Sequence, residues 1–138
     1  VVYTDFEKAF DKVPHKRLVE KLRGYGVRGD LLNWIAAFLA DRRQRVRVNG
    51  KYSGWSRVVS GIPQGSILGP LLFVIYINDL PEILEGRAAI ALFADDAKIY
   101  GEVMERSDVE IMQGVVDDVD SWCRTWMIKI NSAKGTLT

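Results

Sequence analysis

The chain has 138 residues, of which 48% are apolar and 27% are charged, and its 19 Lys and Arg nearly balance its 18 Asp and Glu. This length suits one domain with a substantial core, and the low net charge argues against a disordered chain. The single cysteine excludes an internal disulfide or a multi-cysteine zinc cluster, and the single histidine excludes a His-rich metal site. No apolar run approaches the roughly 18–20 residues of a membrane span. Carboxylates that hold a hard divalent cation are the strongest remaining chemistry.

The first part of the chain predicts a strand followed by two helices. Residues 1–6 are β-branched and aromatic, which is typical of a strand. A helical pattern opens at Pro14 and ends at the glycines of 24–26, and Asp30 is placed to cap a second helix. The apolar face of this second helix is so wide that we expect the helix to lie largely in the core. Its apolar residues are Leu31, Leu32, Trp34, Ile35, Phe38 and Leu39.

The middle of the chain predicts a hairpin and a buried helix. Residues 43–59 alternate around Asn49-Gly50, a pair that tolerates positive φ at both positions of a two-residue turn. The apolar run from Leu71 to Leu80 predicts a buried helix that Pro81 closes.

The last third predicts a second hairpin, a long helix and a final strand. Residues 88–93 and 97–100 form two short strands around Asp95-Asp96. Ser107 and Glu110 form a capping box that begins the helix. Its expected core face comprises Val109, Met112, Val115, Val116, Val119, Trp122, Cys123 and Trp126. Residues 127–130 suggest one more strand. The pattern therefore predicts an α+β fold with helices packed on one side of a sheet.

Three acids stand at strand ends or turns: Asp5, Asp95 and Asp96. If the two strands are neighbours in the sheet, the acids converge, and carboxylates this close repel unless a cation lies between them. A pair of divalent ions about 3.5–4 Å apart accelerates in-line phosphoryl transfer. Because successive strand residues face opposite ways, we expect one strong ligand and one weaker partner from Asp95-Asp96. The alternative is a polar hairpin tip, with Asp5 as a capping or turn residue.

Three longer motifs, read in order, resemble those of reverse transcriptases, and most closely those of LINE-like retrotransposons, which lack long terminal repeats. They are YTDFEKAFD at 3–11, SGIPQGSILGPLLF at 60–73 and FADDAKIY at 93–100. Shorter matches lie at 14–18, 43–46 and 75–81, so the resemblance covers nearly the whole chain.

The resemblance implies roles for particular residues. Asp5 and Asp95 would be the main metal ligands, with Asp96 close by and less directly bound. The incoming nucleotide would contact Phe6, Phe10, Gln64 and Gly65, with Phe10 as the steric gate against a ribonucleotide's 2′-hydroxyl. Lys134, in an Asn-x-x-Lys match, would protonate the leaving pyrophosphate as a general acid. Gly135 departs from this motif, where a small polar or sulfur side chain is expected.

The hairpin in the middle of the chain is rich in arginine. Period-two spacing places Arg43, Arg45 and Arg47 on one face, which suits contacts with nucleic-acid phosphates. A solvated edge strand, protected from aggregation by its charge, explains the same pattern. By contrast, we expect Cys123, Trp122 and Trp126 to pack in the core.

The resemblance implies an RNA-directed DNA polymerase that adds deoxynucleotides to a primer 3′-hydroxyl with two Mg²⁺ ions, for which Mn²⁺ can substitute. Its partners would be an RNA template, a DNA primer and deoxynucleoside triphosphates, with no membrane. The expected fold is a palm-like antiparallel sheet with helices on one face. Residues 1–138 would form one domain fragment, the palm with part of the fingers, lacking the upstream fingers and the thumb. Two alternatives are an inactive relic or recruited domain that binds nucleic acid or protein, and a structural domain without nucleic-acid contact.

Overall fold

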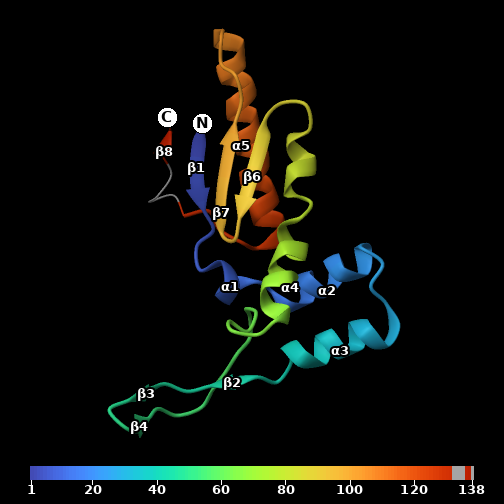
Figure 1. The fold of residues 1–138 in the computed structure, drawn as a ribbon, viewed down its shortest axis with the longest axis vertical. Coiled ribbons are helices and arrows are strands. Elements are labelled where there is room, and N and C mark those ends of the chain that lie inside the picture. The colour runs from blue at the N-terminus through green and yellow to red at the C-terminus, as the bar shows by residue number, and fades with distance from the viewer. Residues whose placement is uncertain (132–135, 138) are drawn as a thin grey trace.

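A four-stranded antiparallel sheet organises the structure, a computed structural model that describes residues 1–131 and 136–137. The strands lie in the order β6-β7-β1-β8, with bounds Val2–Asp5 for β1, Ala89–Phe93 for β6, Asp96–Tyr100 for β7 and Thr136–Leu137 for β8. β1 runs beside β7 although most of the chain separates them in sequence (Figure 1). The predicted first strand and the predicted hairpin at 88–100 are therefore confirmed.

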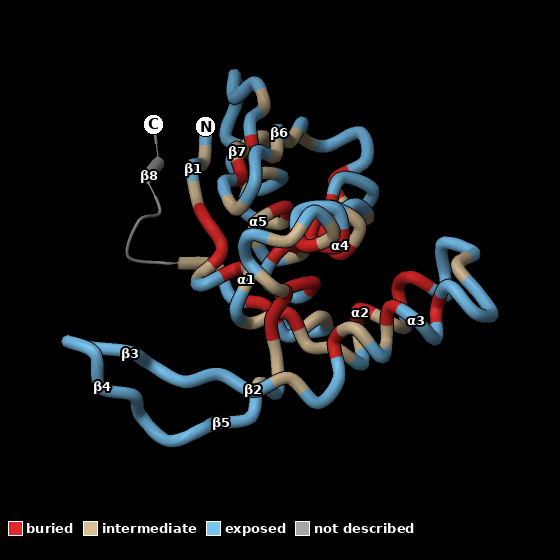
Figure 2. Tube along the Cα trace, turned by 60° about the horizontal axis from the view of Figure 1, so that its bottom comes forward, coloured by how far each residue is buried: buried red, intermediate tan, exposed pale blue. Residues whose placement is uncertain are grey.

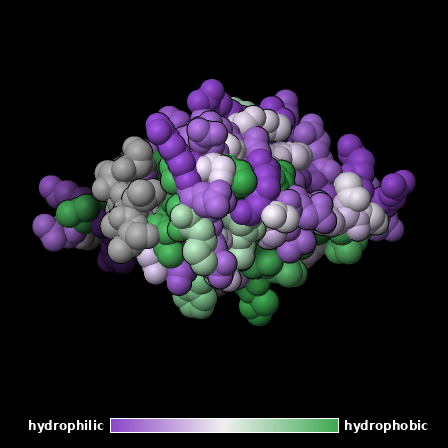
Figure 3. Space-filling view, turned by 90° about the horizontal axis from the view of Figure 1, so that it is seen from above, coloured by the Kyte–Doolittle hydropathy of each residue, from purple (hydrophilic) through white to green (hydrophobic). Residues whose placement is uncertain are grey.

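The two faces of this sheet differ in burial. Ala97 and Ile99 of β7 point into the core, whereas Tyr3 and Tyr100 are exposed on the opposite face. Helix α5 lies behind the sheet (Figure 1), and its Trp122 packs against Phe6 with ring centroids 6.4 Å apart. In a view from above, hydrophilic side chains cover most of the surface and hydrophobic ones gather along one edge (Figure 3). The α+β prediction is confirmed, with the helical core on one face of the sheet.

The four longer helices of the described residues follow the predicted order with shifted ends, whereas the two short ones at 9–12 and 80–84 were not predicted. The helices are α1 at Ala9–Lys12, α2 at His15–Gly24, α3 at Gly29–Leu39, α4 at Leu68–Ile77, the 3-10 helix η1 at Leu80–Leu84 and α5 at Arg106–Trp126. Pro81 does not close α4 as predicted but lies in the first turn of η1, where proline costs no hydrogen bond. None of these helices has the length and apolarity that a bilayer crossing requires.

Helix α3 is less buried than its composition predicted. Leu32, Ile35 and Leu39 are in the core, but Leu31 and Trp34 are exposed. The reason is that α3 packs mainly on α2, which covers only one stripe of its surface (Figure 2). The predicted cap was also wrong: the helix begins at Gly29, so Asp30 lies inside the first turn.

The capping box of α5 lies two residues earlier than predicted. Glu105 and Asp108 form it, and not Ser107 with Glu110. The Asp108 carboxylate accepts hydrogen bonds from the backbone N–H groups of Glu105 and Met104 at 2.9 and 2.8 Å, which lowers the pKa of Asp108. Val109 is exposed because the first turns of α5 extend beyond the sheet (Figure 1).

The rest of the predicted core face of α5 is largely confirmed. Val115, Val119, Trp122 and Cys123 are buried, and Trp126 is half-buried. Burial raises the pKa of the Cys123 thiol to about 12, so this cysteine is an unreactive core residue at neutral pH. The predicted strand at 127–130 was wrong, because only Ile130 makes a bridge, to Phe6.

The arginine-rich segment, residues 43–57, forms an exposed hairpin that we call the arm. It contains β2 at Arg43–Gln44, β3 at Arg47–Val48, β4 at Lys51–Tyr52 and β5 at Ser56–Arg57. β2 pairs with β5 and β3 pairs with β4 around Asn49 and Gly50, which have φ of 49° and 79°. The predicted hairpin and turn are confirmed. Every residue of the arm is exposed, and the arm projects away from the core (Figure 2).

A buried lysine joins three helical segments. Lys21 of α2 is 5% exposed, and its ammonium donates to Asp79 Oδ1 at 2.5 Å and to the Tyr76 carbonyl at 2.6 Å. It also lies 4.0 and 4.5 Å from the ring centroids of Trp126 and Trp122, both in α5. Desolvation lowers the pKa of Lys21, and the Asp79 carboxylate opposes this effect. The lysine therefore links α2, the end of α4 and α5.

Lys21→Met should lower the free energy of unfolding by about 3 kcal/mol, because Asp79 loses its ammonium partner and the two indole rings lose a cation. Urea denaturation checks this value. Lys16→Met, at an exposed position of the same helix, should change it by less than about 0.5 kcal/mol. Equal effects of the two substitutions would show that the buried contact contributes nothing.

Candidate functional site

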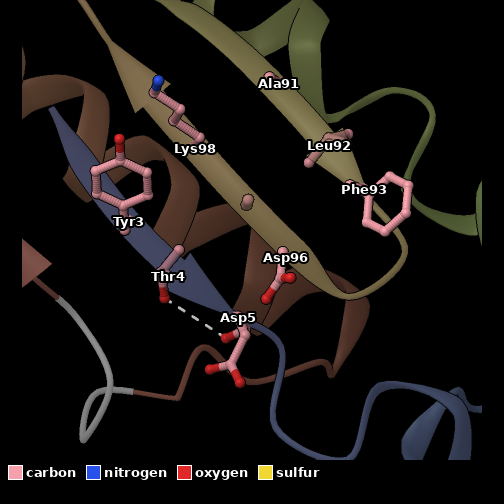
Figure 4. A pocket seen from close by; sticks show the side chains of 9 residues that line it. Tyr3, Thr4, Asp5, Ala91, Leu92, Phe93, Asp96 and Lys98 are labelled. Carbon is pink, nitrogen blue, oxygen red and sulfur yellow. Dashed lines mark hydrogen bonds between the residues drawn. The ribbon is translucent and has the colours of Figure 1, made fainter.

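Two acids from distant motifs lie opposite each other in the sheet. Asp5 ends β1 and Asp96 begins β7, and the antiparallel register pairs these two residues directly. Side chains of directly paired residues share a face, with Cβ atoms about 4.5–5.5 Å apart. Figure 4 shows both carboxylates at the same end of the two strands. The expectation that these strands are neighbours is confirmed, and it brings Asp5 and Asp96 together.

Asp95 occupies a different position, in the turn between β6 and β7. The turn consists of Ala94, with φ of 51°, and Asp95, whose carbonyl accepts a hydrogen bond from Phe6 N–H at 2.9 Å. This bond extends the pairing of β1 with β7 by one step beyond Asp5. Among the described residues, no three Asp, Glu, His or Cys side chains are grouped closely enough to enclose a metal ion by themselves.

A cavity of about 500 Å³ opens over the exposed face of the sheet at the acid pair. Its lining includes Tyr3, Phe93 and Lys98 together with the two acids (Figure 4). The Lys98 ammonium lies 5.3 Å from the centroid of the Tyr3 ring. Tyr3 and Lys98 were not predicted as site residues, although strand alternation from Asp5 and Asp96 identifies the positions that share their face.

The second motif packs against the helix that follows Asp5. Ile62 N–H donates to the Phe10 carbonyl at 2.6 Å, and Gln64 Nε2 donates to Asp11 Oδ1 at 3.3 Å. The half-buried Phe10 ring lies 4.7 Å, centroid to centroid, from Phe73 of α4. The fold thus bonds the loop that contains Gln64 to the segment that contains Phe10 and Asp11, shortly after Asp5 in the chain.

A glycine allows this close approach. Gly61 has φ of +90°, and its N–H donates to the Val13 carbonyl at 2.8 Å. A Cβ at this position would lie 2.6 Å from the Asp11 carbonyl oxygen. The Gly61 carbonyl lies 2.7 Å from His15 Nε2, so the loop is bonded to the start of α2 as well. Gly65, with φ of +82°, supplies the second left-handed position of the loop.

A cationic cleft of about 540 Å³ joins this loop to the base of the arm. Asp11 and Gln64 line one side of it. Its cationic lining residues are Lys8, Arg42, Arg43 and Arg57. Of these, sequence reasoning named only Arg43 as a site residue. The prediction was confined to the period-two stripe of Arg43, Arg45 and Arg47, so it left out Arg42 and Arg57 of the same hairpin, and Lys8 is remote in sequence.

Three groups of predicted site residues are not found at the acid pair in the described part of the chain. The Phe6 side chain is buried against Phe73 and Trp122, so it belongs to the core and offers no ring surface to a nucleotide. Lys134 lies outside the described residues, although nearby Asn131 donates its N–H to the Asp5 carbonyl at 2.8 Å. The arginines Arg43, Arg45 and Arg47 all lie on the exposed arm, which projects away from the four-stranded sheet (Figure 1).

Gly61→Ala should lower the free energy of unfolding by about 2–3 kcal/mol or more, because the methyl group meets backbone and the residue has positive φ. Gly54→Ala is the matched control, since nothing lies within 4 Å of its Cβ position. Chemical denaturation of both variants checks the difference. A loss as small as that of Gly54→Ala would mean that the loop shifts freely relative to α1.

Comparison with known proteins agrees with these motifs. Residues 1–138 match the family described as reverse transcriptase (RNA-dependent DNA polymerase). The chain is 34% identical to the "Probable RNA-directed DNA polymerase from transposon BS" of Drosophila melanogaster, over 96% of this chain and 15% of that protein. It is 34% identical to the corresponding protein of transposon X-element from the same species, over 96% and 15%. It is 30% identical to the "RNA-directed DNA polymerase from mobile element jockey" of Drosophila funebris, over 96% and 15%.

The chain thus spans about 15% of the length of these curated relatives. The family match covers all three motifs, and the predicted resemblance to LINE-like elements is confirmed by the retrotransposon proteins among the relatives. The chain belongs to the reverse transcriptase family, in the branch of the non-LTR retrotransposons.

Proposed function

We propose that this chain contributes the palm, with part of the fingers, of an RNA-directed DNA polymerase that extends a primer 3′-hydroxyl. The observation that carries the proposal is the direct pairing of Asp5 with Asp96, which come from separate motifs. Such an acid pair beside an open cavity is suited to phosphoryl transfer. The partners would be an RNA template, a DNA primer and deoxynucleoside triphosphates.

The acid pair fits a divalent cation, with Mg²⁺ as the proposed ion and Mn²⁺ as a substitute. Mg²⁺ in proteins is commonly held by one or two carboxylates together with water and substrate phosphates, so a closed protein cage is not required. Asp5, Asp95 and Asp96 would hold two ions. When bound, such ions stabilise the attacking and leaving oxygens of an in-line displacement. The strand register favours Asp96 as the residue that shares a metal ion with Asp5, whereas the family resemblance favours Asp95 in that role.

The second motif would position the incoming nucleotide. Gln64 can donate and accept through its amide, and Gly65 allows close approach of the backbone. Phe10 would exclude a 2′-hydroxyl, and the contact of its ring with Phe73 restricts where that ring can move. The role of Lys134 as an acid toward pyrophosphate stays a prediction.

Asp5→Asn should reduce metal-dependent primer extension by roughly 10³-fold or more, because a carboxylate that stabilises transition-state charge is lost. Asp95→Asn and Asp96→Asn, measured in the same assay, show from their remaining rates which of these two carboxylates contributes more. Incorporation of labelled deoxynucleotide on an RNA template, with Mg²⁺ or Mn²⁺, provides the measurement. Glu102→Gln, at an exposed acid outside the site, is the control and should extend normally. Undiminished extension by Asp5→Asn would overturn the ligand assignment.

The wild-type chain in the same assay separates the proposal from its alternative. Incorporation above background supports a polymerase. Salt-sensitive binding to primer and template, without incorporation under either metal, supports a nucleic-acid-binding domain that does not catalyse.

Phe10→Val should increase incorporation of ribonucleotides relative to deoxynucleotides by about 10-fold or more, because the smaller side chain leaves room for the 2′-hydroxyl. The ratio of kcat/KM for a matched ribonucleotide and deoxynucleotide checks this. Val19→Ala, in α2 and outside the site, should leave the ratio unchanged. An unchanged ratio in Phe10→Val would show that the ring does not limit sugar selection.

A further inference from the structure

The arm carries a concentration of positive charge that the described part of the chain leaves largely unneutralised. Its cations are Arg43, Arg45, Arg47, Lys51 and Arg57, and residues 42–57 contain no acid. The ion pair described for the arm joins Arg57 to Asp41 at 3.2 Å, and both of these side chains are largely exposed. An exposed pair of this kind contributes little, so most of the charge is available to a ligand.

The pairing of the strands increases the electrostatic cost of this arrangement. Arg43 and Arg57 lie directly opposite each other where β2 pairs with β5. Like charges at directly opposed positions destabilise a sheet, and an isolated two-stranded hairpin is marginally stable in water. An anionic ligand between the two arginines would offset that repulsion.

Aromatic side chains accompany the cations. The Arg45 guanidinium lies 3.9 Å from the centroid of the Tyr52 ring and 4.5 Å from that of Trp55. Arg47 lies 5.4 Å from the Tyr52 ring. Tyr52 is still 52% exposed and Trp55 is 60% exposed, and neither packs in the core. The arm therefore holds rings in place beside guanidinium groups while leaving ring surface open to a ligand.

We propose that the arm binds single-stranded nucleic acid, with unpaired bases stacked on Trp55 and Tyr52 and phosphates held by the arginines. Stacking on aromatic rings beside a positively charged track is the usual means of binding such strands without sequence preference. The bases of a duplex are already stacked and cannot use these rings. This inference deepens the proposed function, and it rests on that function only for the suggestion that the strand is the unpaired template.

The position of the arm supports continuity with the candidate site. Arg42, Arg43 and Arg57 at its base line the same cleft as Asp11 and Gln64. A nucleic-acid strand bound along the cations of the arm would therefore reach the loop of the second motif, which contains Gln64. The charge also matches an acidic protein segment, and the experiment is designed to separate these partners.

The test is fluorescence anisotropy of a labelled oligouridylate of about 12 nucleotides, a length within the usual site size for such strands. Trp55→Ala should weaken its binding to the whole chain about 10-fold, the loss expected for one stacked base. Trp34→Ala removes an exposed tryptophan from α3, away from the arm, and should leave binding unchanged. Thermal unfolding of both variants confirms that the fold is retained.

One further ligand and one further variant isolate the stacking contribution. An abasic oligomer with the same phosphates should bind Trp55→Ala and wild type equally. Arg47→Gln should reduce the slope of log K against log salt by about 0.7, the value for one phosphate contact on a single strand, whereas Trp55→Ala should keep the slope. This contrast distinguishes a lost base contact from a lost charge contact.

Unchanged oligouridylate affinity in Trp55→Ala would overturn the proposal, as would equal wild-type affinity for single strand and duplex. Equal affinity for polyglutamate would assign the arm to an acidic protein partner instead. Failure of the proposed function is distinguishable: a wild-type chain that binds single strands through Trp55 but incorporates no nucleotide keeps this inference and loses the polymerase. Primer extension by a wild-type chain whose strand binding is unaffected by Trp55→Ala would keep the polymerase and overturn this inference.

Discussion

The pairing of β1 with β7 is the interaction on which the candidate site depends. It places the end of the first motif beside the start of the strand in the third motif, and the Phe6 to Asp95 backbone bond at 2.9 Å continues the pairing into the turn. A slip of one residue would turn every β7 side chain to the opposite face. Asp96 would then point into the core, and Ile99 would face solvent. The buried positions of Ala97 and Ile99 therefore set the register that brings the acids together.

The second motif reaches this site through backbone contacts more than through side chains. Gly61 and Ile62 donate to carbonyls of Val13 and Phe10, so the loop is attached to the segment that directly follows Asp5. A side chain at position 61 would collide with Asp11, and this explains why a glycine is required there. The buried Lys21, in turn, connects the helices beneath the sheet. The motifs are thus held by one sheet register, one close backbone approach and one buried ion pair.

Helix α3 and the arm expose apolar and aromatic side chains because few other elements pack against them. Helix α3 has apolar side chains on two sides but packs mainly on α2, so Leu31 and Trp34 remain exposed. The arm packs on no core element, and its stability depends on the short pairs β2–β5 and β3–β4. Its rings and guanidinium groups contact one another there, which gives the exposed hairpin an ordered surface rather than a plain stripe of charge.

The sequence by itself determined the longer helices, the strands around the three acids, the Asn49-Gly50 turn and the motifs that mark the family, because these depend on local periodicity, turn chemistry and residue order. It misplaced the caps of α3 and α5, the end of α4 and the burial of α3, and it predicted a strand at 127–130 that the structure lacks, because several local signals compete and packing selects among them. Only the tertiary structure decided that Asp96 lies opposite Asp5, that Phe6 is a core residue and that Lys8 and Arg57 share a cleft. These facts depend on strand register and on contacts between segments remote in the chain, which no local pattern encodes.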